Sequence, residues 1–99
     1  EMIVEIVRLR VKPGLSQAFE TAWAEASARY LRRQPGYQAH KLGRQLETER
    51  DYLLAVQWDS LDAHRAFMDH ADFQPFAQSF WHFFDGERDL IQFQPNPAL

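Results

Sequence analysis

The stretch YLLAVQWDSLDAHRAF (residues 52–67) gives the clearest indication of the fold, because the spacing of its apolar side chains changes in the middle. Up to Trp58 these side chains fall on alternate residues, which is the period of a strand, and after Asp59 they follow the spacing of a helix. Asp59 and Ser60 are both good residues to cap a helix N-terminus. The sequence therefore predicts a strand that ends at Trp58 and a helix that runs from there to about residue 70.

Outward from this corner, turn signals divide the chain into further strands and helices. We expect strands over residues 2–11, 37–46 and 90–94, a helix over residues 16–32 capped by Ser16, and a helical segment within residues 72–84 capped by Asp72. The polar loop at 47–51 has the length of a hairpin connection. The predicted order is β-α-β-β-α-α-β, an α+β ferredoxin-like sandwich with an antiparallel sheet, in a single domain over residues 1–99.

Composition narrows the classes of partner. The chain has no cysteine, which excludes disulfides, thiolate metal sites and thiol nucleophiles, and its net charge of −3 argues against a nucleic-acid-binding face. No apolar run is long enough to span a bilayer and the first residues lack the pattern of a signal peptide, so we expect a cytoplasmic protein that does not bind membranes. Small molecules and other protein chains remain as partners.

The first strand predicts self-association, because it is apolar on both faces. Ile3 and Val7 alternate with Val4 and Ile6, whereas the helices can cover only one face of the sheet. A second copy of the chain is the simplest cover for the other face. We therefore expect a homodimer in which two sheets pack together into a dimeric α+β barrel.

Four motifs carry a family resemblance over nearly the whole chain. They are VRLRVKPG (7–14), QPGY (34–37), LLAVQWDSLDAHRAF (53–67) and FQPF (73–76). With them the chain resembles the antibiotic biosynthesis monooxygenase domain of the dimeric α+β barrel superfamily. The resemblance implies a homodimer with a pocket between helices and sheet in each subunit. It also implies a family whose enzymes oxidise quinol-like aromatic substrates with O2 and no cofactor, while other members cleave haem or have no known activity.

Two residues of the strand-to-helix corner are the candidate catalytic residues. Trp58 either lines the pocket and orients a substrate, or packs in the core as a structural aromatic. His64, one helical turn further on, is either a general acid or base or an exposed helix histidine.

The candidate substrate-binding residues extend beyond this corner. Besides Trp58 they include His40, whose strand position points it at a buried face, either the pocket or the dimer interface. The stripe of Phe73, Phe76 and Phe80 supplies an apolar wall, because the aromatic residues of this segment exceed what one helix face can bury in a core.

No cofactor site is visible in the sequence. The four histidines lack metal-ligand spacing, and the isolated glycines form no phosphate-binding loop, so we expect no metal, flavin or nucleotide. Two functions remain open. One is a cofactor-independent monooxygenase for a small aromatic or quinol-like substrate, and the other is a non-catalytic module of the same fold that binds a hydrophobic ligand or dimerises.

Overall fold

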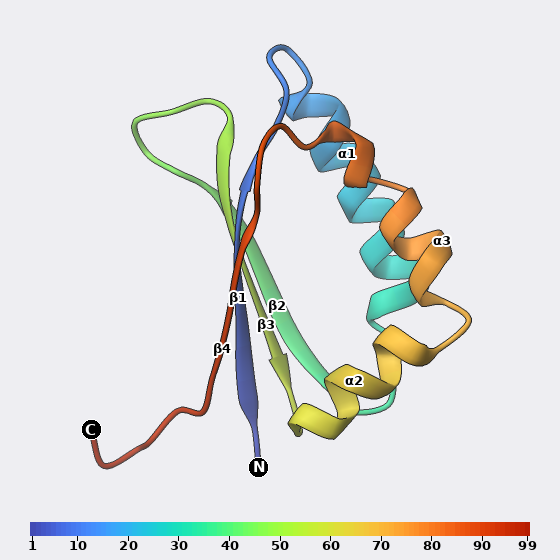
Figure 1. The fold of residues 1–99 in the computed structure, drawn as a ribbon, viewed down its shortest axis with the longest axis vertical. Coiled ribbons are helices and arrows are strands. Elements are labelled where there is room, and N and C mark those ends of the chain that lie inside the picture. The colour runs from blue at the N-terminus through green and yellow to red at the C-terminus, as the bar shows by residue number, and fades with distance from the viewer.

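A computed structural model describes all 99 residues and confirms the predicted order of elements (Figure 1). In chain order these are β1 (Ile3–Arg10), α1 (Ser16–Ala26), the π-helical η1 (Ser27–Leu31), β2 (Tyr37–Arg44), β3 (Asp51–Trp58), α2 (Leu61–Asp69), α3 (Phe73–Gln78), the 3₁₀ turn η2 (Trp81–Phe83) and β4 (Asp89–Phe93). The fold is thus the α+β sandwich expected from the change of period at residue 58.

The four strands form one antiparallel sheet in the order β2-β3-β1-β4. All the helical elements cover the same face of this sheet (Figure 1). Ile3 pairs with Trp58 and Glu5 pairs with Gln92, so the start of β1 lies beside both the end of β3 and the end of β4. This register brings residues from three distant parts of the sequence to one end of the sheet.

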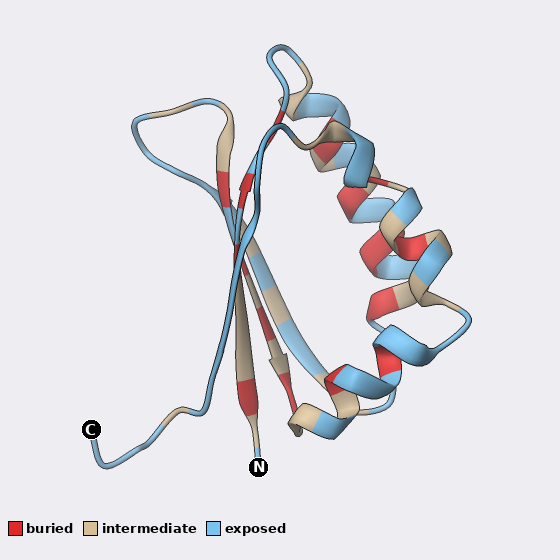
Figure 2. Cartoon of the chain, viewed as in Figure 1, coloured by how far each residue is buried: buried red, intermediate tan, exposed pale blue.

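The core lies between the sheet and the helices, where the buried residues gather (Figure 2). Alternate residues of β1 and β3 point inward, among them Val7, Leu9, Leu54 and Val56. Fifteen buried apolar residues make one continuous cluster. By contrast, every residue of β4 is exposed, because this edge strand has few helical residues opposite it.

The corner between β3 and α2 is held by backbone contacts on both sides. The Ser60 hydroxyl caps α2 by accepting from the Ala63 N–H at 3.0 Å, as one of the two predicted caps. The Asp59 N–H donates to the Gly36 carbonyl at 2.8 Å. Gly36 has φ +83°, and a Cβ there would lie 2.5 Å from the Cβ of Ala63. Only glycine fits at this position, which fixes the approach of α2 to the start of β2.

The helix predicted over residues 16–32 is confirmed as far as Leu31, but two of the predicted caps were wrong. The first helix is α-helical only to Ala26; the Arg32 N–H then bonds the Ser27 carbonyl, which widens the last turn into η1. Ser16 does not cap this helix, because its hydroxyl donates to the Glu49 carbonyl of the β2–β3 loop. Nor does Asp72 cap α3, because its carboxylate pairs with Arg33 and Gln34.

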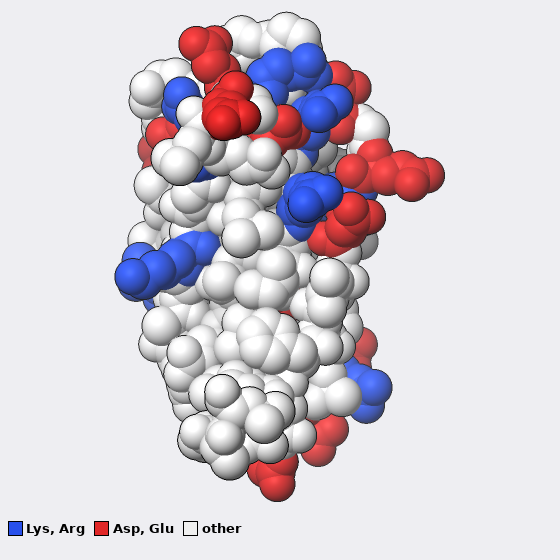
Figure 3. All heavy atoms as spheres, turned by 90° about the vertical axis from the view of Figure 1, so that its left-hand side faces the viewer, with Lys and Arg blue, Asp and Glu red and all other residues white.

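The outer face of the sheet is largely apolar and carries no helix. Val4, Ile6, Leu53, Ile91 and Phe93 point to this side, and the last three are about half exposed or more. Figure 3 shows few charged side chains over the centre and lower part of this face, with most charges at its upper end and margins. The sequence prediction that β1 is apolar on both faces is confirmed.

None of the helices is both long enough and apolar enough to cross a lipid bilayer.

Candidate functional site

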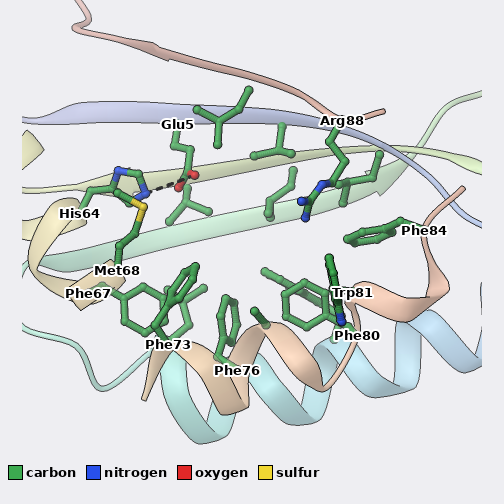
Figure 4. Close-up of a pocket in the computed structure, with 18 of the residues that line it drawn as sticks. Glu5, His64, Phe67, Met68, Phe73, Phe76, Phe80, Trp81, Phe84 and Arg88 are labelled. Atoms are coloured by element: carbon green, nitrogen blue, oxygen red, sulfur yellow. Dashed lines mark ion pairs between the residues drawn. The ribbon is translucent and has the colours of Figure 1, made fainter. Parts of the chain in front are cut away.

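A cavity of about 570 Å³ lies between the inward face of the sheet and the helices (Figure 4). Sixteen of its 21 lining residues are hydrophobic, so its walls suit an apolar, aromatic-sized molecule. The aromatic part of the lining comes from α1, α2, α3, β3 and the segment around η2, and consists of Trp23, Trp58, Phe67, Phe73, Phe76, Phe80, Trp81 and Phe84.

A polar cluster occupies one end of this cavity. His64 Nε2 lies 3.3 Å from Glu5 Oε2, and the side chains are 6% and 12% exposed. His64 Nδ1 lies 2.6 Å from Gln92 Nε2, while the Trp58 indole N–H points to Glu5 Oε1 at 3.5 Å. The cluster thus joins β1, β3, α2 and β4, and Glu5, His64 and Trp58 all line the cavity.

These contacts assign a hydrogen-bonding role to each atom of the pair. With the Gln92 amide donating to Nδ1, the His64 ring carries its proton on Nε2 and donates it to the Glu5 carboxylate. Glu5 therefore receives a hydrogen bond on one oxygen and only a long contact from Trp58 on the other. Such a carboxylate has free acceptor capacity at the cavity wall and can take a proton from a bound molecule.

The residues deep in the cavity and those at its rim differ in their exposure to solvent. Trp58 and His64 are 1% and 5% exposed, whereas Trp81 and Leu90 are 56% and 55% exposed. Met68 on α2 is also 45% exposed, so the cavity opens along the side between the helical elements and the edge strand β4. Figure 4 shows Arg88 at this end, away from the Glu5–His64 pair.

The structure brings together five of the six site residues that the sequence suggested. Trp58, His64, Phe73, Phe76 and Phe80 all line the one cavity. Of the two alternatives for His64, an exposed helix histidine is wrong, because the ring is buried.

His40 lies elsewhere. It points inward from β2 into a second hollow of about 510 Å³, and Trp23 is common to the linings of both. The Trp23 indole donates to His40 Nε2 at 3.3 Å, so the neutral ring carries its proton on Nδ1, 2.7 Å from the Tyr37 hydroxyl. Burial, and then the charge of Arg32, lower the pKa of His40 below its ordinary value. The His40 ring thus supports Trp23 in the wall of the aromatic cavity but does not itself line that cavity.

Sequence reasoning missed Glu5 and Gln92. A signal for Glu5 was present, because it interrupts the inward series Ile3, Val7 and Leu9 of the first strand with a carboxylate. A charged residue in an otherwise apolar strand face commonly has a buried partner. Gln92 could not be found in this way, because its contact with His64 depends on the pairing of β4 with β1.

No group of three or more His, Asp or Glu side chains lies close enough together to hold a metal ion.

Comparisons with known proteins agree with this architecture. The profile of the antibiotic biosynthesis monooxygenase family matches residues 2–79. A solved structure from Bordetella bronchiseptica, assigned to the same monooxygenases, is 30% identical, covers 96% of this chain and 97% of its own, and has a TM-score of 0.85. A variant of SnoaB, a cofactor-independent oxygenase from Streptomyces nogalater, is 24% identical over 99% of this chain and 96% of its own, with a TM-score of 0.86.

A sequence relative comes from a further bacterium. The uncharacterised protein YczJ of Bacillus subtilis (strain 168) is 38% identical over 63 residues, which are 64% of this chain. The match spans 65% of that protein, slightly less than two thirds of its length.

Proposed function

Since the chain belongs to the antibiotic biosynthesis monooxygenase family, we propose that it is a cofactor-independent monooxygenase for a small aromatic or quinol-like substrate. The observation that carries the proposal is the aromatic cavity with the buried Glu5–His64 pair at one end. The likeness in fold to SnoaB, a cofactor-independent oxygenase, supports it.

The proposed reaction begins at a ring carbon next to the hydroxyl-bearing part of the substrate. In the keto form of the substrate, this ring carbon carries two hydrogens. The Glu5 carboxylate, which the His64 N–H holds in place, takes one of these hydrogens as a proton. The resulting carbanion then transfers one electron to O2. The substrate radical and superoxide join in a C–O bond, and the peroxide takes up the proton. Loss of water breaks the O–O bond and the remaining C–H bond, so that one oxygen atom becomes the product carbonyl and the other leaves in water.

In this proposal the protein supplies geometry and a dry environment. Trp58 packs against the His64 ring at 5.6 Å between ring centres and limits where the substrate ring can lie. The opposite wall of Phe73, Phe76 and Phe80 excludes water from the anion and from superoxide. Trp58 and His64 are thus proposed as functional residues, with Glu5 added as the proton acceptor.

The test is oxygen uptake by the purified protein with a panel of anthrone-like and quinol substrates, followed by mass spectrometry under ¹⁸O2. One labelled oxygen per product molecule, and no hydrogen peroxide, is the expected result. Protein-free reactions measure spontaneous oxidation. Saturable binding of these compounds without oxygen uptake would refute the monooxygenase and favour the alternative, a non-catalytic module that binds hydrophobic ligands.

We also propose that the protein is a homodimer joined through the outer face of the sheet. The support is the uncovered apolar surface that includes Leu53, Ile91 and Phe93, since monomers rarely expose so large a patch. Light scattering should give a mass of about twice 11.7 kDa. The substitution Ile6→Lys, which places a charge at the centre of this outer face, should shift the measured mass towards that of the monomer. The same substitution at Ala66, exposed on α2, serves as the control.

A further inference from the structure

Arg88 is the one lysine or arginine in the lining of the aromatic cavity. It precedes β4, and the alternation of that strand places Arg88, Leu90 and Gln92 on the side of the helices, whereas Ile91 and Phe93 face outward. In Figure 4 the Arg88 guanidinium points into the cavity between the sheet and the aromatic residues below it.

No carboxylate of the protein neutralises this cation. Arg88 forms no ion pair, and its guanidinium lies over the face of Phe84, at 5.6 Å from the ring centre. The only carboxylate in the lining is Glu5, which pairs with His64 instead. A guanidinium with five free donors beside apolar walls is a site for a planar anion such as a carboxylate.

The two polar ends of the cavity are separated by the length of an aromatic ring system. Arg88 lies four residues before Gln92, and Gln92 is the partner of Glu5 in the sheet. The Cα atoms of Arg88 and Gln92 are therefore roughly 13 Å apart along the strand direction. The space between them is lined by aromatic and aliphatic side chains. A ligand that fills it has a reacting ring near Glu5 and a further group near Arg88.

From this arrangement we infer that the protein selects aromatic molecules of two or three fused rings that carry a carboxylate at the end remote from the reacting ring, and that Arg88 binds this carboxylate. The inference deepens the proposed function and rests on it for the identity of the reacting end. The preference for a carboxylate can be measured without turnover.

Two ligands that differ only in charge test this selection. Anthraquinone-2-carboxylate and anthraquinone-2-carboxamide have nearly the same size, and neither can be oxidised further. Binding is measured by quenching of tryptophan fluorescence, because all three tryptophans, Trp23, Trp58 and Trp81, line the cavity. We expect the carboxylate to bind only about fivefold more tightly, because Arg88 is exposed and solvent weakens its attraction for an anion. Raising the salt concentration should reduce that ratio.

Variants of Arg88 decide whether this residue is the cause. Arg88→Gln should abolish the preference, and Arg88→Lys should retain part of it. Arg65→Gln removes an exposed arginine that does not line the cavity, makes the same change in net charge, and should leave the ratio unchanged. Equal affinities for the two ligands in the natural protein, no binding of either, or a preference that survives Arg88→Gln would each overturn the inference.

Oxygen uptake separates this inference from the proposed function. A protein that prefers the carboxylate through Arg88 but consumes no oxygen would refute the monooxygenase and leave the anion site standing. A protein that oxidises acidic and neutral quinols equally well would refute the anion site and support the monooxygenase.

Discussion

Replacing Glu5 with glutamine is the most direct test of the proposed chemistry. Glutamine keeps the size and an acceptor oxygen for the His64 N–H, but its amide cannot take up the substrate proton. Loss of a general base typically slows turnover by about 10²–10⁴-fold, which corresponds to roughly 3–5 kcal/mol in the barrier. We expect kcat to fall by this factor.

The stability of the Glu5→Gln variant should change little. The carboxylate receives contacts of 3.3 Å from His64 and 3.5 Å from Trp58, both long, and glutamine can retain one of them. The free energy of unfolding should therefore fall by less than about 1 kcal/mol, which lowers the melting temperature by less than about 8 °C. Thermal unfolding at one protein concentration checks this part.

The pair should also behave as a unit. If His64 acts by holding the Glu5 carboxylate, His64→Gln lowers kcat, and the double variant is scarcely slower than Glu5→Gln alone. Glu25→Gln, an exposed carboxylate on α1, is the matched control and should keep normal turnover. Normal kcat in a folded Glu5→Gln protein would refute the assignment of Glu5 as proton acceptor.

Three further predictions concern the frame around the site. Gly36→Ala should lower the free energy of unfolding by about 1–3 kcal/mol, because φ is +83° and the new Cβ would meet Ala63; an unchanged urea midpoint would contradict this. Phe76→Ala should cost about 3 kcal/mol, the low end for a buried phenylalanine, because part of its ring already faces the cavity; urea unfolding measures it, and a cost below 1 kcal/mol would be inconsistent with its packing. Burial lowers the pKa of His40 in the folded protein, so the unfolded chain binds more protons and stability should fall as the pH drops below about 6.5, through the folded pKa. In His40→Gln, whose amide oxygen can still accept from Trp23, this part of the pH dependence should disappear; an identical dependence in both proteins would exclude His40 as its source.

Much of the fold follows from the sequence because its signals are local. The period of apolar residues changes from two to three or four after Trp58, and a capping serine follows at once, so strand, corner and helix are readable from neighbours in the chain. The errors arose where a distant partner competed with a local preference. Asp72 was expected to cap a helix, and its carboxylate instead pairs with Arg33, 39 residues away.

The candidate site was only partly readable for the same reason. Residue type and helical spacing suggested Trp58, His64 and the phenylalanine wall, and these positions do share one cavity. His40 has the same inward orientation in its strand, but Trp23 stands between it and the cavity, which no spacing in the sequence reveals.

The elements, their order and the apolar character of both sheet faces could be predicted, because these depend on the spacing of side chains along a strand or helix. Which polar groups meet depends instead on how the strands pair and the helices pack. The antiparallel register of β1 with β3 and β4 places Glu5 beside Trp58 and Gln92, and the α2 corner carries His64 to the same point. Such a cluster joins residues up to 87 positions apart, and its geometry is set by strand pairing and helix packing rather than by any local pattern.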